Sequence, residues 1–202
     1  MSTAVWAVLG VIGLIVMVVL AIALWAIGAY NNFVRLKNLV SEGWSGIEVQ
    51  LKRRSNLVPN LVATVKGYAE HESSVFEEVT QARASIGRGS VGEQAAAEST
   101  MAKSLMHLFA VAENYPDLKA DKNFQQLQAE LSDLEDVIQK ARRYYNGTVR
   151  DFNTELELFP GNLIAGMFNF ASAEFFELEN EADAAVPEVC LLYTSPSPRD
   201  PT

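Results

Sequence analysis

The chain has 202 residues, with 16 Lys and Arg against 25 Asp and Glu, so its formal net charge is −9. An acidic chain lacks the clustered cations that neutralise phosphates, which argues against a nucleic-acid partner. Its only cysteine is Cys190, which excludes an intrachain disulfide and a cysteine-rich metal site. The length suits one domain carried by an anchor.

Residues 1–30 carry no charged side chain and are rich in Val, Leu, Ile and Ala. A helix rises about 1.5 Å per residue, so about 20 apolar residues cross a hydrocarbon core of roughly 30 Å. We therefore predict an anchor with a single transmembrane helix over about residues 4–29. A cleavable signal peptide would have a shorter apolar stretch and a basic start, whereas no Lys or Arg precedes Arg35. We expect the anchor to be retained.

Aromatic and basic side chains flank the predicted span. Trp6 lies near one end, and Trp25 and Tyr30 lie near the other, as in the aromatic belts of membrane proteins. Arg35 and Lys37 follow the span, and Lys and Arg are preferentially retained on the cytoplasmic side. We predict a single-pass protein of the inner cell membrane with its N-terminus outside and its domain in the cytoplasm.

Residues 31–180 are predicted to form an all-α domain. Their apolar residues recur at alternating spacings of three and four, which places each row on one face of a helix. Because one-faced helices bury their apolar faces against each other, we predict an antiparallel bundle of three to four long helices. The first of these helices is expected to continue from the membrane helix. The four rows begin at Phe33, Val58, Met101 and Phe124.

Helix-breaking residues separate these rows. Pro59 should kink or restart the first helix, with Asn56 as a possible cap. Glycines within residues 85–92 mark a loop, and Pro residues follow the third and fourth rows. The aromatic segment of residues 163–176 is expected to pack along the bundle as a final short helix. Contact with the membrane or with a partner is the alternative.

Several motifs resemble the bacterial LemA family, over roughly residues 1–180. The resemblance implies a membrane-anchored, mostly helical cytoplasmic domain without an established enzymatic activity. Some relatives belong to the protein set of magnetosome membranes, which hints at organising membranes or assemblies. The motifs are Tyr30-Asn31-Asn32, Trp44 to Arg54, Leu57 to Val62, Val65 to Glu72, Glu113 to Lys119, Ala141 to Asn146, Phe159-Pro160 and Phe175-Phe176-Glu177.

The likeness ends at Val186, in a C-terminal segment of different character. Residues 189–202 look like translated sequencing adaptor, which is not native sequence. Because the segment is rich in Pro and Ser, we predict a disordered tail over residues 181–202.

The two histidines do not fit a catalytic or metal-binding pattern. A carboxylate-bridged di-metal site in a bundle needs Glu-x-x-His pairs, but Tyr68 precedes His71 and Ser104 precedes His107 at that spacing. The chain has no Gly-rich phosphate loop of the Walker type. We therefore predict no catalytic, cofactor or metal site, no enzymatic activity and no small-molecule substrate.

Glu72 falls at a core position of the second row, where an unpaired carboxylate would be costly. We expect an internal ion pair with Arg142 or Arg143 of the long fourth row, which would fix the register of two antiparallel helices. A polar pocket that binds a ligand is the alternative.

Two functional hypotheses follow from the sequence. The first is a scaffold or adaptor in the lipid bilayer, with a membrane protein or further copies of the chain as its partner. The second is a sensor of a small molecule or a metal, using the region around Glu72 and His71.

Overall fold

The computed structural model describes residues 3–177, which form six helices and no strand. The prediction of an all-α chain is confirmed for these residues, whereas the tail predicted over residues 181–202 lies outside them. The helices are α1 (Thr3–Lys66), α2 (Ser73–Ser85), α3 (Val91–Ala112), α4 (Pro116–Ala120), α5 (Lys122–Glu157) and α6 (Gly161–Met167).

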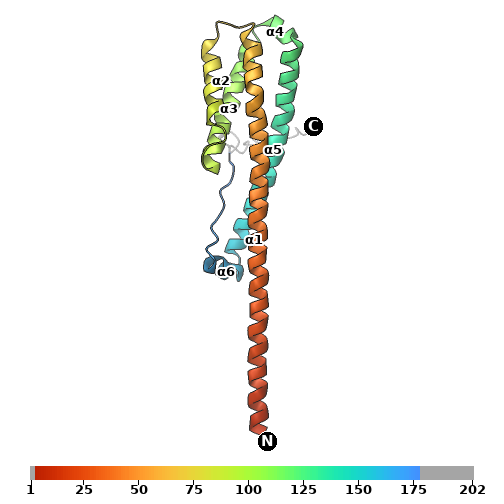
Figure 1. Ribbon diagram of the computed structural model, residues 1–202, viewed down its shortest axis with the longest axis vertical. Coiled ribbons are helices and arrows are strands. Elements are labelled where there is room, and N and C mark those ends of the chain that lie inside the picture. The colour runs from red at the N-terminus through yellow and green to blue at the C-terminus, as the bar shows by residue number, and fades with distance from the viewer. Residues whose placement is uncertain (1–2, 178–202) are drawn as a thin grey trace, which may run out of the picture.

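Helix α1 has 64 residues and no interruption. At 1.5 Å per residue it is about 96 Å long. Its first part extends alone beyond the other helices (Figure 1), with the apolar side chains exposed. Among the described residues, it is the one helix that is long and apolar enough to cross a membrane, judged by length and composition. As expected, the apolar run and the first row of the domain belong to the same helix.

Pro59 lies inside α1, so that of the two expected alternatives, a kink or a restart of the helix, the restart with Asn56 as a cap is wrong. A proline removes the N–H that would bond the carbonyl of the residue four positions earlier, here Ser55. The Arg83 side chain of α2 supplies the missing donor, because its Nε lies 2.8 Å from the Ser55 carbonyl oxygen. The continuation of α1 past Pro59 is therefore supported by a neighbouring helix.

The chain passes up α1, down α2, up α3 and down α5, so that α5 runs antiparallel to α1 (Figure 1). The predicted loop between α2 and α3 contains Gly87 and Gly89 at φ 82° and 87°, where glycine is favoured. Ser90 and Glu93 form a capping box at the start of α3. The Asp121 carboxylate caps α5 by accepting from the N–H groups of Asn123 and Phe124.

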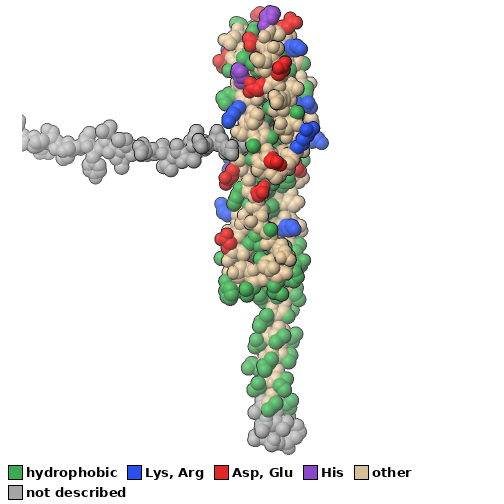
Figure 2. Space-filling model, turned by 90° about the vertical axis from the view of Figure 1, so that its left-hand side faces the viewer, with side chains coloured by type: hydrophobic (Ala, Val, Ile, Leu, Met, Phe, Trp, Pro, Cys, Tyr) green, Lys and Arg blue, Asp and Glu red, His purple; other side chains and the backbone are tan. Residues whose placement is uncertain are grey.

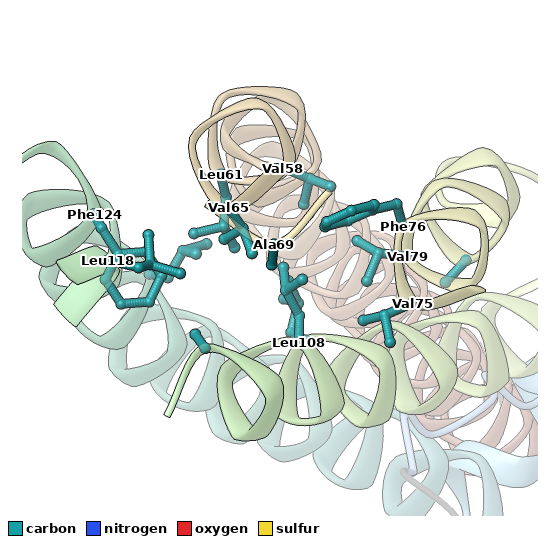
Figure 3. Packing of buried hydrophobic residues seen from close by; sticks show 14 of the residues in the cluster. Val58, Leu61, Val65, Ala69, Val75, Phe76, Val79, Leu108, Leu118 and Phe124 are labelled. Carbon is teal, nitrogen blue, oxygen red and sulfur yellow. The ribbon is translucent and has the colours of Figure 1, made fainter. Parts of the chain in front are cut away.

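The buried apolar residues form three successive clusters along the axis. The upper cluster joins α1, α2, α3, α4 and α5, and Figure 3 shows Val58, Leu61 and Val65 of α1 facing Val79 of α2 and Leu108 of α3. The middle cluster joins α1, α3 and α5 to Phe176. The lower cluster joins α1 and α5 to α6.

Helix α1 approaches α5 closely at Gly43. A Cβ atom added there would lie 3.2 Å from the Cα of Tyr145. Only glycine permits this approach without displacing the α5 backbone. The two long helices are therefore in direct contact in the middle of the molecule, where the candidate site is built.

Candidate interaction site

The last described residues, 170–177, follow a turn at Phe168 and Asn169 and form an extended segment that we call the strap (Figure 1). After α6 the strap turns back and runs upward along the helices toward the lower ends of α2 and α3 (Figure 1). The sequence predicted a packed helix over residues 163–176. The structure confirms the packing, but the helix ends at Met167 and the strap is not helical.

Two asparagines of α5 hold the strap by its backbone. The amide of Asn153 accepts from the N–H of Ala173 at 2.9 Å and donates to its carbonyl at 3.0 Å. Asn146 makes the same pair of bonds with Phe176, at 2.9 and 3.1 Å. The asparagines are seven residues apart, so they lie on one face of α5, two turns from each other. Each side-chain amide accepts one bond from the strap backbone and donates one to it, as a neighbouring β-strand would. We call Asn146 and Asn153 the asparagine clamps.

Aromatic side chains fix the strap against α1 and α5. Phe176 is fully buried and lies beside the ring of Trp44, at 5.8 Å between centroids. The Tyr145 hydroxyl donates to the Glu174 carbonyl at 2.7 Å. Lower down, Phe170 stacks on Phe33 at 5.1 Å. The strap therefore occupies a groove between the two long helices in the manner of a bound peptide.

A cavity of about 450 Å³ remains beside the strap. Its lining is mostly apolar and aromatic, with Trp44 and Phe170 among its walls and Lys37 as its one cationic residue. The groove is therefore incompletely filled by the strap, which leaves room for further apolar groups.

A buried charge cluster joins three helices above this groove. Arg54 of α1 is buried and forms ion pairs with Glu98 of α3 and Glu135 of α5, the second at 2.8 Å. Glu98 is buried as well, whereas Glu135 is partly exposed. A buried pair of this kind fixes the relative register of the helices that carry it.

Burial raises the pKa of Glu98 above its usual range, and the positive charges of Arg54 and Arg142 oppose that rise. Its Oε2 atom is buried without a hydrogen-bond partner, as is Oε1 of Gln50, which lies one turn before Arg54 on α1. Protonation of Glu98 would relieve the cost of this unpaired oxygen.

The structure does not bring Glu72 together with Arg142 or Arg143. Glu72 lies in the turn between α1 and α2 at the upper end of the molecule, where it accepts from the Tyr115 hydroxyl at 3.2 Å. The arginines lie about 20 residues from the upper end of α5, or about 30 Å along its axis. The positive charge of Arg142 is instead one of those that oppose the rise in the pKa of Glu98, a buried carboxylate other than Glu72.

His71, the other residue of the sensor hypothesis, is exposed in the same turn. Residues 3–177 contain no group of three His, Cys, Asp or Glu side chains placed to hold a metal ion. His107 pairs with Glu78 at 3.0 Å, and the bonds from His107 and Ser104 lower the pKa of Glu78. This contact links α3 to α2.

The side chains predicted to mark the membrane interface occupy the exposed surface of α1. Trp6 and Trp25 are 19 positions apart in the sequence, which corresponds to about 28 Å of helix and matches a hydrocarbon core. Tyr30 is only partly free, because its ring lies 4.7 Å from that of Phe168. Arg35 donates to Asn32, and Lys37 is exposed.

Comparison with known proteins gives consistent matches. The sequence profile of the LemA family matches residues 43–190. Magnetosome proteins MamQ 1 and MamQ 2 of Paramagnetospirillum magneticum are each 27% identical over 184 residues, covering 78% of this chain and 68% of theirs. Protein LemA of Metamycoplasma hominis is 28% identical over 161 residues, covering 76% of this chain and 72% of its own.

Proposed function

The chain belongs to the LemA family, and from that premise we propose that it is a non-enzymatic, single-pass scaffold or adaptor of the inner membrane. In this proposal its helices form an antiparallel bundle that binds a membrane protein or further copies of the chain. The resemblance to proteins named for the magnetosome fits a role in a membrane assembly.

One observation carries the proposal: the apolar run and the domain share the uninterrupted helix α1. Packing against the rest of the domain starts at Ala26 and Ala29, still within the uncharged run. No flexible linker separates the two parts. From Tyr30 to Lys66 the helix rises about 54 Å. A partner bound to the domain would be held at a fixed distance and orientation from the bilayer.

The groove of the strap supports the same proposal. In this groove, Asn146 and Asn153 hold the extended strap of the chain itself through backbone bonds. Such bonds do not depend on the side chains of the peptide. In the proposal, a partner occupies the cavity of about 450 Å³ that the strap leaves beside it.

For the orientation we propose an external N-terminus and a cytoplasmic domain, because Arg35 and Lys37 follow the span. A cysteine introduced at exposed Met106, in a Cys190→Ser background, tests this topology. A membrane-impermeant maleimide should label it only after the cells are opened. Labelling of intact spheroplasts would reverse the orientation.

Photocrosslinking in native membranes tests the scaffold itself. A photoreactive residue would replace Val49 or Tyr144, which are exposed apolar positions on α1 and α5. We expect discrete products, either a dimer of the chain or one recurrent protein partner, that disappear after solubilisation in detergent. A lipid-facing position, Leu14, is the control and should yield lipid adducts. The scaffold proposal fails if neither self-contacts nor a recurrent protein partner is recovered.

A further inference from the structure

The lower end of the domain carries apolar side chains that the protein itself does not cover. Five residues around α6 are between 53% and 79% exposed, and we call them the foot: Leu158, Phe159, Leu163, Met167 and Phe168. Figure 2 shows apolar side chains gathered at the base of the wide part of the molecule, where the single helix emerges. A contiguous apolar patch of this kind marks a contact with a membrane or another protein.

The foot is fixed to α1 at the height where the uncharged run ends. Ile164 and Ala165 of α6 are buried in one cluster with Phe33, and Ala26 and Ala29 of α1 pack against that cluster. Because Phe168 also contacts Tyr30, the foot cannot move along the axis of α1 without losing buried area. Its apolar side chains therefore continue the exposed apolar surface of α1, which includes Leu24 and Ile27.

The charges around the foot favour a lipid surface. Residues 158–173 contain no charged side chain, and the first charge of α1 is Arg35. Glu155 and Glu157 precede the foot on α5, so attraction to anionic headgroups is not the basis of the contact. An uncharged, partly aromatic element beside a membrane span matches the boundary between headgroups and acyl chains, where apolar burial provides the affinity.

We propose that the foot is a second membrane contact, immersed in the same bilayer leaflet through which α1 leaves the membrane. The inference rests on the proposed anchoring by α1. In this proposal two elements, α1 and the foot beside it, connect the domain to the bilayer. Two contacts restrict the tilt of α1, whereas a single helix is free to tilt over a wide range.

Three exposed methionines provide matched probe positions. Met17 lies in the anchor, Met167 in the foot and Met106 on α3, and they are 68%, 73% and 67% exposed. Each would be replaced by cysteine in the full-length Cys190→Ser chain and labelled with an environment-sensitive nitrobenzoxadiazole dye. The labelled chains would be reconstituted into phosphatidylcholine vesicles at a low protein-to-lipid ratio. The lipids would carry a nitroxide quencher either at a shallow or at a deep position of the acyl chain.

The proposal predicts a different quenching pattern at each position. The dye at position 17 should be quenched most by the deep nitroxide, the dye at position 167 most by the shallow one, and the dye at position 106 by neither. A second variant, Leu163→Asp, should reduce the shallow quenching at position 167 at least twofold and leave position 17 unchanged. Unchanged quenching in this variant would contradict the proposal.

The outcomes separate the two proposals. Absence of quenching at position 17 would overturn the membrane anchor itself. Quenching at position 17, with position 167 behaving like position 106, would overturn the foot alone. A blue-shifted dye at position 167 that no lipid quencher reaches would show that a second copy of the chain covers the foot, and this result too would overturn the proposal. Gel filtration and circular dichroism would confirm that each variant is folded.

Discussion

Polar contacts fix two regions of the molecule by opposite chemistry. At the buried charge cluster, Arg54 meets Glu98 and Glu135, so charged side chains are taken out of water and must satisfy one another. At the strap, Asn146 and Asn153 bond to backbone groups, and every partner is neutral. The charge cluster joins α1 and α3 to α5, whereas the asparagines join the strap to α5.

The two contacts differ in how their strength depends on pH and on the loss of one partner. A buried ion pair is costly to break, because removal of one partner leaves the other charge unpaired. The strength of the pair also depends on whether its carboxylate is protonated. Neutral amide bonds each contribute about 1 kcal/mol and do not titrate. We therefore expect loss of the cation in the charge cluster to cost more than loss of bonds to the strap. Of these two contacts, only the charge cluster should respond to pH.

The largest effect is expected from Arg54→Ala, which leaves the buried Glu98 carboxylate without its cation. Loss of one partner of a buried pair costs about 3–5 kcal/mol in the free energy of unfolding. Urea titration of the full chain in detergent micelles measures it. Arg53→Ala is the control, because Arg53 is exposed and its loss should cost less than about 0.5 kcal/mol. Equal costs for the two variants would show that the ion pair does not hold the helices.

A smaller effect is expected from Asn153→Ala, which removes both bonds to Ala173. Loss of two hydrogen bonds lowers the free energy of unfolding by at most about 2 kcal/mol. The loss is smaller where water bonds to the freed backbone groups of the partly exposed strap. Hydrogen exchange measures the local result: the Ala173 amide should lose protection while the amides of α2 keep theirs. Asn38→Ala, at an exposed position of α1, is the control. Protection at Ala173 that survives the change would mean that aromatic packing alone holds the strap.

A third change tests a hydrogen bond from a charged side chain to a neutral backbone carbonyl. Such a bond is intermediate between an ion pair and a bond between neutral groups. Arg83→Met removes the donor to the Ser55 carbonyl, and we expect a loss of about 1–2 kcal/mol. In a Pro59→Ala background the residue at position 59 regains its N–H, so the same change should cost less. A double-mutant cycle measures the difference. Additive effects would contradict the assigned role of Arg83.

The smallest effect concerns pH. Because the pKa of Glu98 is raised by burial, the folded state binds its proton more tightly than the unfolded state, whose value is about 4.3. The resulting stability is present below that pH and is lost as pH rises through the folded pKa. The difference in unfolding free energy between the native chain and Glu98→Gln should therefore fall as the pH rises above the pKa of the unfolded state.

The contribution of Asp121 to stability should depend on pH in the opposite direction to that of Glu98. Bonds from the Phe124 N–H and the Tyr68 hydroxyl lower its pKa, so its contribution is lost as pH falls through the folded value. The difference between the native chain and Asp121→Asn should rise with pH, and that for Asn153→Ala should stay flat. A flat profile for Glu98→Gln would remove the pH dependence from the charge cluster.

The helical parts of the fold were predictable because apolar spacing, glycines and prolines act locally. The loop around Gly87 and Gly89 and the long helix beginning near Phe124 followed from such signals. The continuation of α1 through Pro59 was not predictable, because its support comes from Arg83, which is distant in sequence. The prediction of a helical final segment failed after Met167, where bonds to α5 replace those of a helix.

The candidate site was harder to predict than the fold. Arg54 and Glu98 fall at core positions of their rows, between Leu51 and Val58 and before Met101, so the reasoning applied to Glu72 could have found them. Their pairing with one another depends on helix packing, which the sequence does not state. The clamps are spaced by seven residues, but an asparagine on a helix is usually solvated or a cap. Only the returning strap reveals what they bind.

The asparagine clamps also set what can change in the strap over evolution. Their bonds involve the main chain of Ala173 and Phe176, so almost any side chain at the exposed positions between the buried rings leaves the attachment intact. Proline is the exception at positions 173 and 176, since it has no N–H to offer. The attachment therefore depends on the side chains of α5, and the sequence of the strap is free to diversify.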